Sequence, residues 1–303
     1  MVSEMVRHVP IGVTLPQFTA DPEVLISGAR RAEALGLDSI WVFDHLWPLS
    51  GGRQRPVIEG WTALAWLAAA TERIGIGTLV TRSSLRPAAV LAQMAGTVAA
   101  IAPGRLTVGL GSGDARSRAE NEAFGIDYHP GERRATQLAA TAEVLRAHWA
   151  PPAGSGETIA VIPAGPRPWP HPQLWIAGRS DAVMALAGRL ADGWNGWASG
   201  PETFRADVAR LERAACGRRV TPTWGGLVVL GDSDEHARYK LGSRDPSGYV
   251  VGGPDTVAAH LSALVRAGAH HLIVTFPDAA RPGAFERLAR AVRPRIEALV
   301  ATT

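Results

Sequence analysis

Short apolar runs alternate along the chain with longer stretches in which apolar residues recur every three to four positions. The longer stretches, such as those at 25–35, 90–101 and 257–265, predict amphipathic helices. Gly104 and Gly268 follow two of these stretches. A helix often ends on a residue in the left-handed conformation, which glycine adopts readily. The short runs have the length of buried strands and predict eight strands, at 11–15, 39–43, 74–80, 105–110, 174–177, 193–197, 224–230 and 271–276.

The regular alternation of strands and helices predicts a parallel sheet. Eight repeats within about the length of one large domain favour a closed (β/α)8 TIM barrel over an open, doubly wound sheet. We therefore expect an α/β fold and a single domain over residues 1–303. The three long connections fall after strands four and seven and before strand five, at 112–131, 231–252 and 151–172.

The second predicted strand, within "SIWVFDHL", ends on two polar residues, Asp44 and His45. A strand that is buried on both faces exposes polar groups only where it leaves the barrel, and ligands bind at that carboxyl end. Asp44 and His45 are therefore candidate site residues. From these two residues alone, another interpretation is equally open: Asp44 acts only as a cap, His45 is only a hydrogen-bonded histidine, and neither takes part in catalysis.

Two other strand ends carry glycines and hydroxyl groups. The segment "GLGSGD" at 109–114 departs from the G-x-G-x-x-G dinucleotide fingerprint, because Gly113 comes one residue early and Asp114 follows it. Its small side chains allow a flat ring to approach the backbone, although a tight turn explains them as well. In "IAGRSD", Ser180 is placed to cap a helix whose free N–H groups hold a phosphate, with a plain capped helix as the alternative.

Composition and charge narrow the possible partners. The chain has no apolar run of the ~18 residues that a membrane span needs. Its 31 basic residues are interleaved with 28 acidic ones, and a net charge of +3 argues against a nucleic-acid partner. The first residues do not resemble a signal peptide, and a single cysteine cannot form an internal disulfide. We expect a cytoplasmic protein that acts on a small molecule, with neither membrane nor nucleic acid as a partner.

Several other chemistries find no support in the residue pattern. His270 and His271 are adjacent and would face opposite sides of a strand, and no cysteine pair is present, so we expect no metal site. Cys216 falls near a predicted helix end, which argues against a nucleophilic cysteine. Trp61 and Trp66 lie on one predicted helix, and we expect both to pack against the barrel.

Taken in order, the motifs "SIWVFDHL", "IGIGTLVTRSSLRPAAVLAQMAGTVAAIAPGRLTVGLGSGD", "ENEAFGIDYHPGERRATQLAATAEVLRAHW", "PQLWIAG" and "LADGWN" strongly resemble the bacterial luciferase-like monooxygenase superfamily. The resemblance runs from about residue 11 to residue 299 and is closest to the branch of F420-dependent oxidoreductases. It implies a homodimeric TIM barrel that binds either the 5-deazaflavin coenzyme F420 or FMN at the carboxyl-terminal face.

The resemblance also implies roles for individual residues. His45 serves as acid or base beside the ring of the coenzyme, while Asp44 and Asp114 match acidic residues counted with it as catalytic. A strand bulge, often with a non-prolyl cis peptide, falls on Leu79 and Val80. Relatives often have two glycines in the phosphate-binding turn, so Arg179 either pairs with the phosphate or crowds it. The implied coenzyme-binding residues are Asp44, Leu79, Val80, Thr81, Gly111, Ser112, Gly113, Ser117, Ala177, Gly178, Arg179 and Ser180.

The implied activity is hydride transfer between C5 of the deazaflavin and a small organic substrate, with reduction of a C=C, C=N or C=O group. Lys240 is the only lysine, so the lysines that bind a sugar phosphate in some relatives have no counterpart. Arg82, Arg86 and Arg116 are candidates to meet the anionic tail of the coenzyme. The alternatives are an FMN-dependent monooxygenase that uses O2 and a separate flavin reductase, and a non-catalytic flavin- or ligand-binding barrel.

Overall fold

The computed structural model describes residues 8–48, 52–149, 166, 168, 170–281 and 283–301. None of the helices in these ranges is both long and apolar enough to span a bilayer. The strands are β1 Ile11–Thr14, β2 Ser39–Val42, β3 Gly75–Thr78, β4 Thr81–Arg82, β5 Leu106–Gly111, β6 Gln173–Ala177, β7 Gly193–Trp197, β8 Thr221–Leu230, β9 Tyr249–Gly252 and β10 Leu272–Thr275. The helices are α1 Pro22–Ala34, α2 Gly60–Ala70, α3 Ala88–Ile101, α4 Ser117–Ala123, α5 Gly131–Trp149, α6 Asp181–Leu190, α7 Pro201–Ala215, α8 Asp234–Leu241, α9 Pro254–Arg266, α10 Ala284–Arg287, the π-helical turn η1 Leu288–Val292 and α11 Arg293–Ala301.

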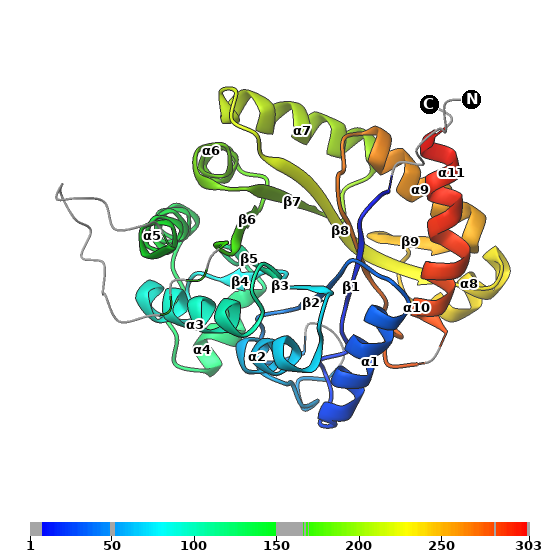
Figure 1. Cartoon of the computed structure of the whole chain (residues 1–303), viewed down its shortest axis with the longest axis horizontal. Helices are drawn as coiled ribbons and strands as arrows, with labels where there is room; N and C mark the ends of the chain where they lie inside the picture. The colour runs from blue at the N-terminus through cyan, green and yellow to red at the C-terminus, as the bar shows by residue number, and fades with distance from the viewer. Residues whose placement is uncertain are drawn as a thin grey trace.

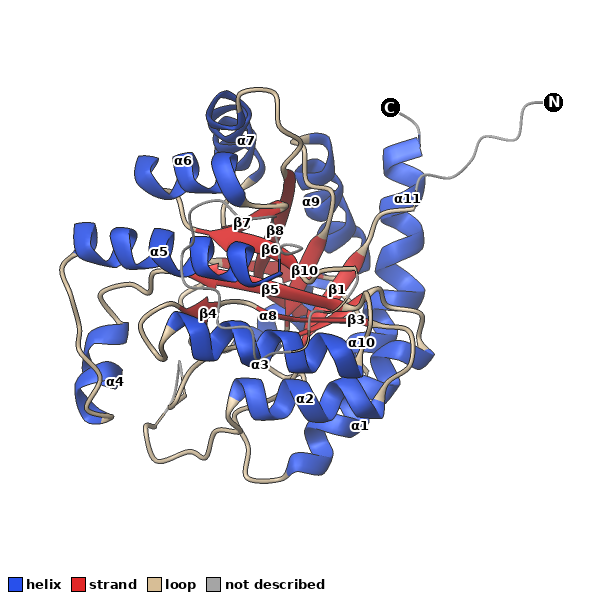
Figure 2. Ribbon diagram, turned by 60° about the vertical axis from the view of Figure 1, so that its left-hand side comes forward, coloured by secondary structure: helices blue, strands red, loops and turns tan. Residues whose placement is uncertain are grey.

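Eight of these strands close into a parallel barrel, in the order β1, β2, β3, β5, β6, β7, β8 and β10. The ring closes because β10 pairs in parallel with both β8 and β1. Helices surround the strands on the outside (Figures 1 and 2). This arrangement is the (β/α)8 TIM barrel that the alternation of strands and helices predicts.

Two short strands fall outside the predicted set. β9 pairs with the outer part of β8, beyond the residues that join β8 to β10. β4 follows β3 after a break at residues 79 and 80 and pairs with the end of β5, so the predicted strand 74–80 leaves the barrel sheet at Thr78. The other seven predicted strands are confirmed, with ends displaced by three residues or fewer.

The long connections carry structure of their own. The predicted connection 112–131 contains α4, and 231–252 contains α8 and β9. Of the connection 151–172, residues 151–165, 167 and 169 lie outside the described residues.

Two tryptophans fill the middle of the barrel, and glycines on the adjacent, paired strands make room for them. The rings of Trp41 and Trp175 lie 5.0 Å apart between their centroids. A Cβ at Gly77 would lie 2.4 Å from the ring of Trp41, and one at Gly193 would lie 2.8 Å from the ring of Trp175. A side chain at either glycine would overlap an indole. The large tryptophans therefore require glycine at the paired positions of the neighbouring strands.

Two helices end near the glycines that the sequence predicts, but two side chains of the predicted apolar face of α3 are exposed. Gly104 and Gly268 have positive φ, +73° and +109°, at the ends of α3 and α9. The predicted apolar face of α3 included Val90 and Ile101, yet these side chains are 49% and 44% exposed. Trp66 on α2 is 39% exposed, so the prediction that it packs against the barrel is wrong, whereas the same prediction for the buried Trp61 is confirmed.

Candidate active site

β2 delivers Asp44 to the carboxyl-terminal mouth of the barrel. Asp44 is 1% exposed, and its two carboxylate oxygens accept hydrogen bonds from Arg86 at 2.6 and 3.0 Å. Burial lowers the pKa of Arg86, but the hydrogen bonds and charge of Asp44 outweigh burial and leave that pKa raised. Arg86 also lies 3.3 Å from Glu59, whose carboxylate caps the start of α2. Asp44 is therefore committed to a buried ion pair that ties the end of β2 to the residues before α2 and α3.

His45, the next residue, finds its acidic partner on α4. Its Nδ1 lies 2.8 Å from Oε2 of Glu120, which is 1% exposed. The other oxygen of Glu120, Oε1, accepts a hydrogen bond from the backbone N–H of Leu46 and lies 2.9 Å from Nη2 of Arg82. Burial raises the pKa of Glu120, but the hydrogen bonds from His45 and Leu46 and the charge of Arg82 outweigh burial, so the pKa is lowered.

The second nitrogen of His45 is left open by this arrangement. The side chain of His45 is 18% exposed, and no residue in the described part of the chain is hydrogen-bonded to Nε2. A histidine with one nitrogen held by a carboxylate and the other free to exchange a proton is the usual geometry of a general acid or base.

Arg82 joins the two acidic residues of the mouth. Its Nη1 donates to Asn121 on α4 at 2.9 Å, and its backbone N–H donates to Asp44 at 3.3 Å. Burial lowers the pKa of Arg82, and the charges of Glu120 and Asp44 only partly oppose that effect. The sequence suggested Arg82 and Arg86 as contacts for an anionic tail, but the structure commits both to buried ion pairs and leaves only Arg116 exposed.

The break between β3 and β4 lies beside this cluster. The peptide bond between Leu79 and Val80 is cis, as the family resemblance implies. Thr81 accepts a hydrogen bond from the indole N–H of Trp61 at 3.0 Å. A Cβ at Gly111 would lie 2.6 Å from Val80, so the missing side chain at Gly111 makes room for Val80 itself. That direct packing explains the glycine without a ligand.

The loop after β5 brings Ser112, Gly113, Asp114 and Ser117 to the start of α4. Gly113 has a positive φ of +70°, and the hydroxyl of Ser112 donates to its carbonyl at 3.2 Å. Asp114 is exposed and accepts from the backbone N–H of Arg116 at 3.0 Å and of Ser117 at 3.2 Å. Its carboxylate thus stabilises the first turn of α4, and a catalytic part for Asp114 stays a prediction.

The turn after β6 has the form of an anion site. Gly178, after Ala177, has a φ of +134°, which suits glycine, and its carbonyl accepts from the indole N–H of Trp194 at 2.8 Å. Ser180 caps α6 by accepting from the N–H of Val183 at 3.4 Å. Arg179 is held by the buried Asp207 on α7 at 2.6 Å, which fixes the guanidinium beside the turn.

Aromatic side chains and one buried amide complete the mouth. Phe43, after β2, and Trp197, at the end of β7, meet edge to face with centroids 6.1 Å apart, although their strands lie on opposite sides of the barrel. Asn195 is 1% exposed, and its Nδ2 donates to Thr223 at 3.0 Å. Its Oδ1 is buried without a hydrogen-bond partner among the described residues. A buried acceptor without a partner can accept a hydrogen bond from a donor group of a ligand.

Metal ligands and the cysteine are the other reactive groups of interest. Within the described residues, no group of three or more His, Cys, Asp or Glu side chains is arranged to hold a metal ion. Cys216 is exposed at the end of α7, and because the helices run antiparallel to the strands, it lies at the amino-terminal end of the barrel.

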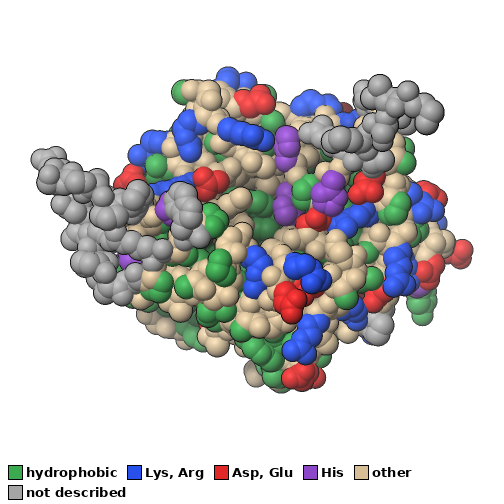
Figure 3. Space-filling view, in the orientation of Figure 1, with side chains coloured by type: hydrophobic (Ala, Val, Ile, Leu, Met, Phe, Trp, Pro, Cys, Tyr) green, Lys and Arg blue, Asp and Glu red, His purple; other side chains and the backbone are tan. Residues whose placement is uncertain are grey.

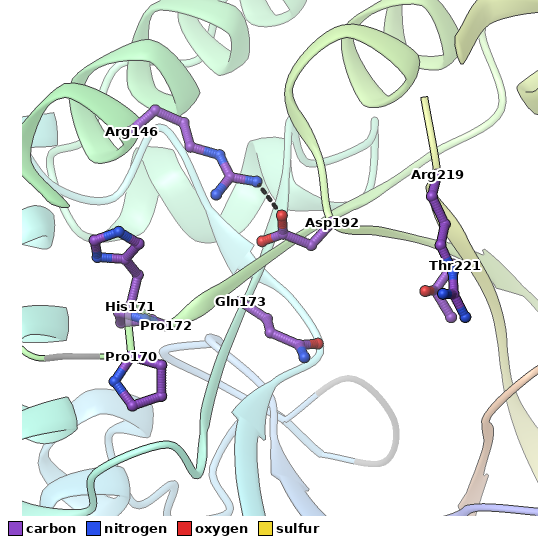
Figure 4. Close-up of a pocket in the computed structure, with 8 residues that line it drawn as sticks. All are labelled: Arg146, Pro170, His171, Pro172, Gln173, Asp192, Arg219 and Thr221. Carbon is purple, nitrogen blue, oxygen red and sulfur yellow. Dashed lines mark ion pairs between the residues drawn. The ribbon is translucent and has the colours of Figure 1, made fainter. Parts of the chain in front are cut away.

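Two hollows, of about 390 and 410 Å³, also lie at the amino-terminal end. Figure 4 shows the first, where Gln173 and Thr221 begin β6 and β8 beside the ion pair of Arg146 and Asp192. The second lies against Trp41 and the starts of β2 and β3. That end of a TIM barrel usually serves stability, so we place the site at the mouth, where the polar strand ends converge.

The sequence assigned no role to Glu120 or Asn121, although they begin one of the motifs that carry the family resemblance. Both sit on α4, a helix of seven residues in a stretch of mixed charge, "ARSRAENEAFG", with no apolar period to mark a buried face. Only the folded chain brings them under the end of β2.

Comparisons with known proteins show the family to which the chain belongs. The sequence profile of the luciferase-like monooxygenase family matches residues 8–248. The F420-dependent glucose-6-phosphate dehydrogenase of Beutenbergia cavernae is 27% identical, over 91% of this chain and 94% of that protein. Alignments with other proteins of that name span only about half of their length.

Solved structures share the fold at lower identity. An F420-dependent secondary alcohol dehydrogenase, in complex with an F420-acetone adduct, is 19% identical with a TM-score of 0.79, over 96% of this chain and 99% of that one. The EDTA monooxygenase of Chelativorans sp. BNC1 is 15% identical with a TM-score of 0.78, over 96% and 94% of the two chains. Because a dehydrogenase and a monooxygenase fit almost equally well, the fold alone does not select the reaction.

Proposed function

The chain belongs to the luciferase-like monooxygenase family, and from that premise we propose that it is an F420-dependent oxidoreductase. It transfers a hydride between C5 of the deazaflavin and a small organic substrate, reducing a C=C, C=N or C=O group. The observation that carries the proposal is His45, whose Nδ1 is held by a buried carboxylate and whose ring is partly exposed at the barrel mouth. The relatives that carry F420 in their names support the choice of coenzyme.

The residues of the mouth fit a flat heterocycle with a phosphate on its tail. Asn195 offers a buried, unpartnered acceptor to a ring N–H. Leu79, Phe43 and Trp197 supply apolar and aromatic surface for a flat ring. The free N–H groups at the start of α6, beside Ser180, suit a phosphate.

In this proposal each residue has a separate task. When bound, the coenzyme supplies a carbon that gives or accepts a hydride. His45 gives or takes the accompanying proton at Nε2, because Nδ1 is engaged by Glu120. Asp44, bound to Arg86, positions the backbone that carries His45. Phe43 and Trp197 restrict the access of water to the barrel.

In this proposal the substrate is not a sugar phosphate. Lys240, the only lysine, lies on α8 and pairs with Asp278 at 2.8 Å. It is therefore occupied by partners at the ends of β8 and β10, and the lysines of a sugar-phosphate site are lacking. We expect a substrate without a phosphate group.

Parallel fluorescence titrations with F420 and FMN test the proposal. We expect the deazaflavin to bind more tightly than FMN and to support substrate reduction. Binding of FMN at micromolar or lower concentration, with none of F420, would move the enzyme to the oxygen-using branch of the family. Coenzyme binding without turnover on any carbonyl, imine or alkene substrate would favour a non-catalytic binding barrel.

A homodimer is part of the same proposal, and α2 and α3 support it. Neither helix contains a charged residue, and Trp66, Val90 and Ile101 on them are exposed. Hydrophobic side chains appear at the lower left of Figure 3, where Figure 1 draws these helices. A surface helix that is apolar all round is usually covered, and a second copy of the chain would cover this face.

A further inference from the structure

Glu120 makes three contacts that together fix one orientation of its carboxylate. Oε1 accepts a hydrogen bond from the N–H of Leu46 and lies 2.9 Å from Nη2 of Arg82 in an ion pair without hydrogen-bond geometry, so one donor and one positive charge converge on the same oxygen. Oε2 is left to face Nδ1 of His45 at 2.8 Å. With Glu120 only 1% exposed, water cannot readily replace any of these partners.

An ionised carboxylate can only accept hydrogen bonds, so Nδ1 of His45 must carry the proton in this contact. The lowered pKa of Glu120 supports the ionised state at neutral pH. Asp44, the neighbouring acid in sequence, cannot serve in its place, because both of its oxygens bind Arg86.

We infer that Glu120 is a positioning residue that fixes the tautomer of His45, with the proton on Nδ1 and an unprotonated Nε2 at the mouth. The inference rests on the proposed function for its catalytic meaning, since Nε2 is where the proton of the reaction enters or leaves. The tautomer itself is a property of the protein without coenzyme.

Glu120→Gln gives a specific test because glutamine has nearly the same shape. The Leu46 N–H and the positive charge of Arg82 beside Oε1 both favour the amide oxygen there, and the NH2 group then faces Nδ1 of His45. A donor in that place requires Nδ1 to accept, so the ring must carry its proton on Nε2. The substitution should therefore invert the tautomer without removing the side chain.

The measurement is 15N NMR of the coenzyme-free protein labelled at histidine, at about pH 9, well above the ordinary histidine pKa. The signal of His45 is assigned by its loss in His45→Gln. We expect Nδ1–H in the wild type, Nε2–H in Glu120→Gln, and no change in Glu122→Gln. Glu122 is the matched control, because it lies on the same helix in an exposed pair with Arg118. An Nε2–H wild type, or a Glu120→Gln spectrum with an unchanged tautomer, would overturn the inference.

Kinetics with the coenzyme form the second arm. Glu120→Gln should lower kcat by about 10–100-fold, as for other residues that orient a functional histidine, with the KM for the coenzyme little changed. An unchanged kcat together with an inverted tautomer would refute the catalytic part of the inference. If the titrations show no F420 binding, the proposed function fails while the NMR result still decides the tautomer, so the two failures are distinguishable.

Discussion

His45 is the residue on which turnover depends most if the proposed function is correct. Its ring spans two environments, with Nδ1 on a buried carboxylate and the side chain 18% exposed at the mouth. Removing the ring leaves no cavity in the barrel core, but it also leaves Oε2 of Glu120 without a donor, which costs stability when the acceptor is buried. A substitution that keeps a donor separates the two effects.

His45→Gln should therefore lower turnover by about 10²–10⁴-fold while the protein stays folded. The amide of glutamine can still donate toward Glu120, whereas it cannot exchange a proton near neutral pH. Steady-state kinetics and a thermal melt measure the two quantities. Full activity in the variant would contradict a role in proton transfer.

His271 lies at the opposite end of the barrel from His45. Its Nε2 lies 2.8 Å from the hydroxyl of Ser39, and its ring packs edge-on against Trp175 at 5.5 Å. Burial lowers its pKa from 6.5 to about 4, with Asp38 opposing and His8 adding to the effect. The folded protein therefore holds this imidazole neutral at pH values where the unfolded chain protonates it.

The sign of the resulting pH dependence follows directly. Above pH 6.5 His271 is neutral in both the folded and the unfolded state, so its contribution to stability is fully present. As the pH falls toward 4, the unfolded state binds a proton at His271 that the folded state does not bind. Stability should fall by up to about 3 kcal/mol over that window. Urea denaturation of the wild type and His271→Gln at several pH values measures it. Parallel curves for the two proteins would show that His271 is not responsible.

At the scale of elements, the fit between β3 and β2 rests on a glycine that faces an indole. A Cβ at Gly77 would meet Trp41 at 2.4 Å and the backbone oxygen of Thr107 at 2.9 Å. Neither neighbour can retreat easily, because Trp41 is itself packed on Trp175 and Thr107 belongs to β5.

Gly77→Ala should destabilise the protein by about 1–3 kcal/mol through overpacking. The matched control is Gly131→Ala at the exposed start of α5, where no atom lies within 4 Å of the added Cβ. The control should change the free energy of unfolding by no more than about 0.5 kcal/mol. Chemical denaturation compares them, and equal stability of the two variants would argue against the packing shown here.

α4 shows how an irregular connection becomes part of a site. It lies in the segment 112–131, where Asp114 stabilises its first turn and Glu120 and Asn121 bind His45 and Arg82. The helix thus fastens the loop after β5 to the end of β2. Its own sequence carries no apolar face strong enough to predict that docking.

At the scale of the whole molecule, the two ends of the chain belong to the same barrel. β1 and β10 pair along Ile11–Leu272, Gly12–Ile273 and Val13–Val274. We propose on this ground that residues 1–303 form a single domain, since the barrel cannot close without both ends.

The uncharged face of α2 and α3 gives the prediction at this scale. Trp66→Glu should convert a homodimer into a monomer, because it places a charge on the face that the second copy would bury. Tyr239→Glu is the control, since Tyr239 is 84% exposed on α8, away from this face. Light scattering after gel filtration reports the mass. A wild type that is monomeric at micromolar concentration would contradict the dimer.

The sequence by itself determined the barrel and the place of its mouth. Apolar period and length are local properties, so the eight strands and the helix ends at Gly104 and Gly268 follow from short windows of residues. The exit of Asp44 and His45 at a strand end follows in the same way, because a strand buried on both faces admits polar groups only where it leaves the sheet.

Only the tertiary structure decided which polar groups meet. His45 and Glu120 are 75 residues apart, and the adjacent Asp44 is taken by Arg86. The pairing of charged side chains depends on their distance in the folded protein and on whether both are buried. Neither quantity can be derived from a short window of sequence. For the same reason the period of α3 placed Val90 and Ile101 on one apolar face with Val98, although Val98 is buried and the other two are exposed.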